Sequence, residues 1–131
     1  IAVSYDEAGN KTDSCTLVSA GDNTKLTLRP DKTEMKADNE DMVFVDVSLT
    51  DNMGIVKNLE DQNVTVQVTG AAKLAGIGSA NPITEESYLG DTVSTWNGRM
   101  GIWIRSNGHK GIAYIQVKTD TLEDNLKIKV F

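Results

Sequence analysis

The amino-acid sequence predicts an all-β protein, a two-sheet β-sandwich of about seven to eight strands preceded by a short N-terminal hairpin. Three observations lead to this fold class. Short runs of apolar residues alternate with polar ones, which is the pattern of a half-buried strand. Turn-forming residues separate these runs. No segment repeats its apolar residues with a helical period, and 131 residues suffice for one domain with its own core.

The first twenty residues predict a separate hairpin. The runs Ile1–Tyr5 and Ser14–Val18 flank a short polar turn. A two-stranded hairpin of this kind is at best marginally stable alone in water. Small and polar residues over Ala20–Asn23 then mark the strongest internal boundary. We therefore expect residues 1–20 to lie outside the core of the sandwich, which we expect to span residues 22–131.

The remaining chain contains eight predicted strands, of which the clearest places Val43, Val45 and Val47 on one face and ends in a turn over Asp51–Gly54. The predicted strands are Lys25–Leu28, Thr33–Lys36, Val43–Thr50, Val64–Gly70, Leu74–Ile77, Trp96–Ser106, Gly111–Lys118 and Leu126–Val130. The residues expected to be buried are Val43, Val45, Val47, Val64, Val66, Val68, Ile102, Ile104, Ile115 and Val117.

The two strands Trp96–Ser106 and Gly111–Lys118 are expected to pair as a hairpin, through either a four-residue loop or a two-residue Asn107-Gly108 turn. With the four-residue loop Trp103 lies opposite Tyr114, and both alternatives leave the two aromatic rings facing outward. The candidate partner or sugar-contact surface is Trp103, Tyr114, Arg105 and Ile112. Three roles remain open for it: a cross-strand pair that stiffens the sheet, a contact with another domain, and stacking against sugar.

Composition excludes several classes of partner. Thirteen Lys and Arg residues against nineteen Asp and Glu residues give a net charge of −6, which argues against nucleic acid and against an anionic membrane. No apolar run approaches the length of a membrane-spanning helix. Cys15 is the only cysteine, so an internal disulfide is impossible. The sequence begins at Ile1 without a signal peptide, and we expect it to be a piece of a longer protein.

The residues that most often carry catalysis are scattered. His109 is the only histidine and lies in a predicted loop, without the clustered ligands that zinc requires. Glu85 and Glu86 are adjacent, whereas glycoside hydrolysis needs two carboxyl groups that face each other across a bond. The acidic residues near Asp38 and Glu60 lack the spacing of a calcium loop. We expect no catalytic residue, no metal site and no cofactor.

A family resemblance extends over residues 26–131. The segments that carry it, in order, are Leu28–Asp38, Val43–Gly54, Val64–Gly70, Leu74–Gly78, Asn81–Pro82, Glu86–Tyr88, Trp96–Arg99 and Ile104–Ser106. Each is a strand edge or a turn, and their order over about a hundred residues resembles the immunoglobulin-like domain at or near the C-terminus of bacterial family 2 glycoside hydrolases, chiefly beta-galactosidases. Ser79-Ala80 departs from the asparagine-glycine of many relatives.

This resemblance implies an immunoglobulin-like accessory domain, with residues 1–21 as the terminal strands and linker of a preceding β-sandwich domain. The catalytic glutamates of that family lie in a barrel domain that this chain does not include, so no catalytic residue carries over. The implied partners are the neighbouring domains of the parent hydrolase, with carbohydrate as the alternative. The implied location is periplasmic or extracellular.

Overall fold

The computed structural model describes residues 1–131 and contains eleven β-strands and no helix. The bounds of the strands are β1 Ala2–Tyr5, β2 Lys11–Cys15, β3 Lys25–Pro30, β4 Glu34–Met35, β5 Met42–Thr50, β6 Asn63–Gly70, β7 Ala72–Gly78, β8 Thr92–Ser94, β9 Arg99–Ser106, β10 Gly111–Lys118 and β11 Glu123–Val130. None of its elements is a helix with the length and apolarity needed to cross a membrane.

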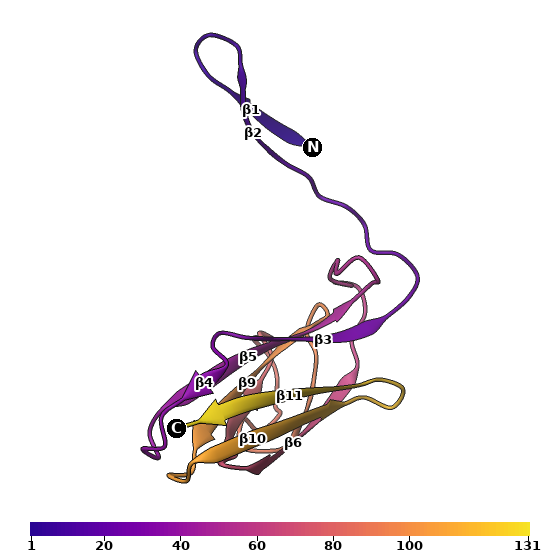
Figure 1. Ribbon diagram of the computed structural model, residues 1–131. Helices are drawn as coiled ribbons and strands as arrows, with labels where there is room; N and C mark the ends of the chain where they lie inside the picture. The colour runs from indigo at the N-terminus through magenta and orange to yellow at the C-terminus, as the bar shows by residue number, and fades with distance from the viewer.

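The strands after residue 24 form a β-sandwich of two sheets (Figure 1). One sheet has five strands in the order β4-β11-β10-β6-β8, and the other has four in the order β3-β5-β9-β7. The predicted all-β sandwich is therefore confirmed. It has one strand more than the eight predicted, because β8 is only three residues long and too short for an alternating pattern. All pairs are antiparallel except β4 with β11, whose parallel pairing joins Glu34 to Lys129.

The core lies between the two sheets and consists of the inward-facing residues of the alternating strands. Nine of the ten residues predicted to be buried are buried, and seven of them, including Val45 and Ile104, have a relative exposure of 0%. The exception is Val68, which is half-buried. It lies beyond Thr65, the last residue of β6 that pairs with β8, so β6 is the free edge of its sheet at Val68.

The predicted pairing of the two strands around residue 107 is wrong. β9 lies between β5 and β7, whereas β10 lies between β11 and β6 in the opposite sheet. The loop after Ser106 therefore crosses from one sheet to the other. Period-two alternation determines which face of a strand is buried, but it does not identify the neighbouring strand. Ile104 and Ala113 both face the core as expected, from opposite sides of it.

A tight turn that the sequence analysis did not identify leads into β9. Asn97 and Gly98 have φ angles of 51° and 72°, and Trp96 and Arg99 exchange two backbone hydrogen bonds of 2.8 and 3.1 Å. This is a two-residue hairpin turn of type I′, for which Asn-Gly is a preferred sequence. The turn directs the chain from β8 in the five-stranded sheet to β9 in the four-stranded sheet.

The hairpin of β1 and β2 projects away from the sandwich (Figure 1). Every residue from Ile1 to Ser19 is exposed. The first hydrogen bond between this end of the chain and the sandwich is donated by the Gly21 amide to Asp51. The hairpin thus contributes no side chain to the core.

Deleting residues 1–20 is expected to leave a cooperatively unfolding domain with a melting temperature close to that of the whole chain. The reason is that residues 1–19 are exposed and none of the deleted residues belongs to the core of the sandwich. Thermal unfolding followed by circular dichroism and calorimetry checks this. A loss of cooperative unfolding on deletion would place the structural boundary before Gly21.

Candidate docking surfaces at the linker and on the outer sheet faces

Asp51 fixes the point at which the linker meets the sandwich. It follows the last residue of β5, in the Asp51–Gly54 turn. One of its carboxylate oxygens accepts hydrogen bonds from the amides of Met53 (2.8 Å) and Ile55 (2.9 Å). The other accepts the Gly21 amide at 2.8 Å. The side chain therefore stabilises its own turn and binds the linker at the same time.

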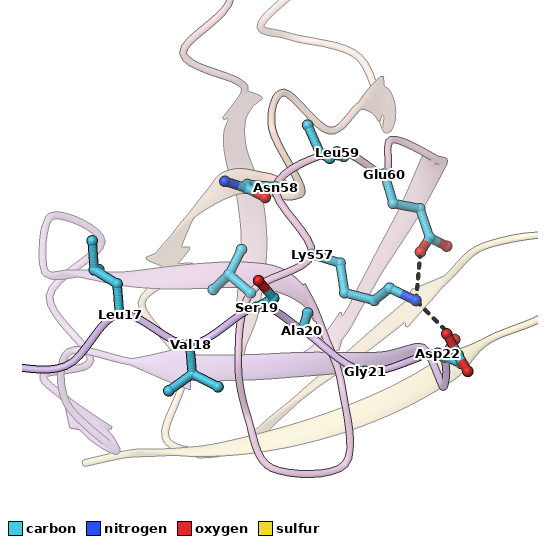
Figure 2. Close-up of a pocket in the computed structure, with 11 residues that line it drawn as sticks. Leu17, Val18, Ser19, Ala20, Gly21, Asp22, Lys57, Asn58, Leu59 and Glu60 are labelled. Carbon is cyan, nitrogen blue, oxygen red and sulfur yellow. Dashed lines mark hydrogen bonds and ion pairs between the residues drawn. The ribbon is translucent and has the colours of Figure 1, made fainter. Parts of the chain in front are cut away.

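Lys57 makes a second attachment between the loop after β5 and the linker. Its Nζ donates to the carbonyl oxygen of Asp22 (2.9 Å) and to Oγ1 of Thr24 (2.8 Å), and lies 3.1 Å from a carboxylate oxygen of Glu60. Thr24 Oγ1 in turn donates to Glu60 at 2.9 Å. Figure 2 shows the Lys57 side chain reaching between the linker and Glu60. We call Asp51, Lys57 and Glu60 the linker clasp.

Hydrogen bonding holds both carboxyl groups of the linker clasp in the charged form. The amides of Gly21 and Ile55 lower the pKa of Asp51 below its usual value, against the opposing effect of burial. The side-chain amide of Gln62 and then Lys57 and Thr24 lower the pKa of Glu60. A carboxylate accepts these hydrogen bonds more strongly than a carboxylic acid does, so the clasp depends on ionisation.

Acid is therefore expected to release the linker from the sandwich. A group whose pKa is lower in the folded state stabilises that state above its unfolded pKa, and the contribution is lost as the pH falls through the folded pKa. For Asp51 this places the loss below about pH 4. The measurement is the chemical shift and hydrogen exchange of the Gly21 amide as a function of pH.

Asp51→Asn is the matched control for that titration, because it keeps the shape of the side chain without its charge. The acid-dependent change at Gly21 is expected to disappear in this variant. The local signal is needed because the pKa values of Asp38 and Asp41 are lowered as well, so overall stability falls in the same pH range. A Gly21 amide that is unchanged by acid in the wild-type chain would contradict the role of Asp51.

A cleft of about 730 Å³ lies between the linker and the loop that carries the clasp (Figure 2). Residues 17–22 form one wall and residues 56–60 form the other. Leu17 and Leu59 line this cleft with 94% and 98% of their surface exposed, and Val18 is also exposed. Apolar side chains that gather beside polar anchors typically mark a surface for a partner. This cleft is the first candidate docking surface.

A second candidate lies on the outer face of the four-stranded sheet, around Trp103. Phe44 of β5 pairs with Trp103 of β9, and their ring centroids are 5.0 Å apart with the planes tilted by 54°. Tyr88, in the loop between β7 and β8, lies over the same face, where its ring packs on Gly78. A cleft of about 370 Å³ is bounded by these three rings and by Asp46 and Arg99.

The structure separates the four residues predicted to share one surface. Trp103 and Arg105 lie on β9, whereas Tyr114 and Ile112 lie on β10 in the other sheet. Trp103, Tyr114 and Ile112 are exposed as expected, but they belong to opposite outer faces of the sandwich. The prediction that Trp103 and Tyr114 form a cross-strand pair is therefore wrong. The cation near the Tyr114 ring is Lys127, whose Nζ lies 5.7 Å from the ring centroid.

Phe44 is the neighbour of Trp103 that the sequence analysis missed. Its outward direction follows from the alternation with Val43 and Val45, but the pairing of β5 with β9 was needed to bring it to Trp103. No alternating pattern predicts the position of Tyr88, because it lies in an irregular loop. The sequence predicts the Asp51–Gly54 turn, which contains one residue of the linker clasp. No sequence pattern predicts the contact of Asp51 with Gly21, thirty residues earlier in the chain.

Two of the remaining polar candidates, Glu86 and His109, have partners within the chain. Glu86 accepts the Ser94 amide at 2.8 Å, which ties the irregular loop to β8. His109 is exposed, and its ring lies 3.2 Å from the side-chain oxygen of Asn107. No group of three or more His, Cys, Asp or Glu side chains is placed to hold a metal ion. The candidate sites are therefore two clefts on the surface of the β-sandwich.

Comparisons with known proteins agree with this architecture. The family model described as glycoside hydrolase family 2 C-terminal domain 5 matches residues 26–126. Beta-galactosidase BoGH2A of Bacteroides ovatus is 26% identical over 116 residues, which are 88% of this chain and 14% of that protein. The chain therefore spans about a seventh of the length of this curated relative.

Two solved structures extend the comparison. A glycosyl hydrolase family 2 member from Bacteroides cellulosilyticus is 32% identical, with a TM-score of 0.94 over 98% of this chain and 17% of that one. A beta-glucuronidase from Parabacteroides merdae is 21% identical, with a TM-score of 0.62 over 86% of this chain and 13% of that one. At that identity the second match shows the shared fold alone.

Proposed function

The chain belongs to the glycoside hydrolase family 2 C-terminal domain 5 family, and on that premise we propose that it is a non-catalytic accessory domain that holds a fixed position within a larger glycoside hydrolase. A domain of this family is a C-terminal domain, distinct from the catalytic one. The observation that carries the proposal is the linker clasp, which attaches the incoming chain to the sandwich at Gly21, Asp22 and Thr24.

The clasp supports a positional role because it restricts the direction in which the chain enters the sandwich. A free linker of small residues would let the two sides reorient. Here residues 21–24 are held by two backbone and two side-chain contacts to Asp51, Lys57 and Glu60. In this proposal residues 1–21 are the terminal strands and linker of a preceding β-sandwich domain, and residues 22–131 are the accessory domain.

The exposed apolar residues beside the clasp support a neighbouring domain of the same protein as the partner. Leu17, Val18 and Leu59 line the cleft beside the linker, next to the segment that would connect the sandwich to a preceding domain. The match to the Bacteroides cellulosilyticus structure covers 98% of this chain, so it includes residues of the β1–β2 hairpin as well as the sandwich. We assign the domain to a beta-galactosidase-like parent because of its similarity to BoGH2A, and to a periplasmic or extracellular location because of the family resemblance.

The experiment that tests the proposal measures the orientation of the linker on the sandwich. Spin labels at Ser19→Cys and Thr121→Cys, in a Cys15→Ser background, report the distance between the linker and the β10–β11 loop by pulsed electron resonance. A narrow distance distribution is expected for this chain. Lys57→Met keeps the length of the side chain and removes its three polar contacts, so the distribution is expected to broaden.

Lys73→Met is the matched control, because Lys73 is an exposed lysine of β7 that lies outside the clasp. The distance distribution of the Lys73→Met variant is expected to match that of the labelled chain without a lysine substitution. Thermal unfolding of each variant confirms that the sandwich remains folded. A distribution that is already broad before substitution, or equally narrow in Lys57→Met combined with Asp51→Asn, would refute the positional role.

A further inference from the structure

The floor of the cleft around Trp103 includes the backbone of two glycines, Gly78 and Gly101. Gly101 of β9 lies between Asp46 of β5 and Gly78 of β7 in one cross-strand row. In the next row Trp103 lies between Phe44 and Gly76. The three glycines carry no side chain to fill the outer face, so the centre of the four-stranded sheet is flat where its neighbours carry rings.

Two of the rings lie directly on this floor. A Cβ atom at Gly101 would stand 2.6 Å from Cε2 of Phe44, and one at Gly78 would stand 2.9 Å from Cδ1 of Tyr88. Each ring therefore packs against the backbone of a glycine. This packing accounts for the glycines, but it leaves 43% of Trp103 and 58% of Tyr88 exposed around the cleft. The exposed parts of these two rings are accessible to a ligand.

The polar side of the cleft is an ion pair with unused hydrogen-bonding capacity. Arg99 lies 3.1 Å from Oδ2 of Asp46 through one guanidinium nitrogen. Oδ1 of Asp46 and the other nitrogens of Arg99 have no hydrogen-bond partner within the protein. The pair thus presents an acceptor and several donors side by side, while its charges cancel.

We propose that this cleft binds a pyranose unit of a neutral saccharide chain. The apolar C–H face of the sugar stacks on Trp103 beside Tyr88, and two neighbouring hydroxyl groups bridge the ion pair, one donating to Asp46 and one accepting from Arg99. A neutral ligand is favoured because the cancelled charges give no net attraction for an anion or a cation. The volume of about 370 Å³ lies within the range of about 300–1,000 Å³ typical of small-molecule sites.

This inference is independent of the positional role, because the cleft and the linker clasp use different residues. It is tested on the 131-residue chain by residue-resolved NMR titration with neutral oligosaccharides: β-1,4-linked galactose, glucose and xylose oligomers. Oligogalacturonate serves as the anionic comparison. Saturable shifts are expected at the amides of Gly78 and Gly101 and at the Trp103 indole for at least one neutral oligomer.

Trp103→Ala is expected to weaken that binding at least about tenfold, the effect of removing a central aromatic anchor. Tyr88→Ala and Arg99→Gln change exposed side chains outside the core and are expected to weaken it too, which keeps the test valid if Trp103→Ala disturbs the sheet. Tyr114→Ala is the matched control, because Tyr114 is as exposed as Trp103 but lies on the opposite sheet. The Tyr114→Ala variant is expected to bind the neutral oligosaccharide as tightly as the unsubstituted chain does.

Three results would overturn the proposal. One is the absence of saturable shifts with every neutral oligomer up to its solubility limit. Another is tighter binding of oligogalacturonate than of any neutral oligomer. The last is the appearance of the same shifts when only the protein concentration is raised, which would identify a second copy of the chain as the occupant.

Discussion

Gly98→Ala is expected to lower the free energy of unfolding by about 2–5 kcal/mol. Gly98 has a φ of +72°, a conformation that costs an L-residue about 1–2 kcal/mol. A Cβ at this position would also stand 2.5 Å from the carbonyl oxygen of Lys57 and 3.1 Å from its carbonyl carbon. Because the obstacle is the backbone of Lys57, the loop that carries Lys57 must move. Overpacking of this kind costs about 1–3 kcal/mol more. Urea denaturation at constant m-value measures the loss.

Gly54→Ala separates the two contributions to this loss. Gly54 has a similar φ of +81°, but the nearest atom to its added Cβ is a guanidinium nitrogen of Arg29 at 4.0 Å. In this variant only the backbone conformation lowers the free energy of unfolding, by about 1–2 kcal/mol. Equal losses at Gly54 and Gly98 would show that the contact with Lys57 has no energetic effect. Because Lys57 belongs to the linker clasp, Gly98→Ala is also expected to loosen the linker.

Ile104→Ala is expected to cost about 2–5 kcal/mol, the range for removing a large aliphatic side chain from a well-packed core. Ile104 is fully buried, between Val43 on β5 and Leu74 on β7. The substitution leaves a cavity that the two sheets cannot close without moving apart. Thermal and urea unfolding both measure this effect.

Ile83→Ala is the matched control for Ile104→Ala. The Ile83 side chain is 82% exposed in the loop after β7, so its truncation is expected to change stability by no more than about 0.5 kcal/mol. A loss at Ile104 as small as the loss at Ile83 would contradict the packing of β9 between β5 and β7.

The sequence predicts the faces of the strands well because burial acts on each strand separately. Val43, Val45 and Val47 alternate with residues that reach the outer face, and a shift of one residue would exchange the two sets. The same reasoning correctly places Trp103 and Tyr114 outside the core. These predictions need no knowledge of which strands are neighbours.

Neighbouring strands could not be predicted in the same way, because pairing depends on the whole topology. β9 and β10 follow each other through a short loop, and adjacency in sequence favours a hairpin. In the structure each of them already has two other neighbours. The Asn97-Gly98 turn carried a recognisable hairpin signal, and it indicates where the chain leaves β8. The contact of Phe44 with Trp103 and that of Asp51 with Gly21 depend on tertiary structure and leave no local pattern.

The parallel pairing of β4 with β11 has a consequence for how this domain folds. It joins Glu34 to Lys129, ninety-five positions apart, and the Phe131 carbonyl oxygen accepts the Ala37 amide at 2.7 Å. Closing so long a loop carries an entropic cost before any contact compensates for it, and sandwiches dominated by such pairings fold in milliseconds to seconds. The five-stranded sheet can be completed only when almost the whole chain is available. Until β11 joins the sheet, the edge of β10 is open and can pair with another molecule.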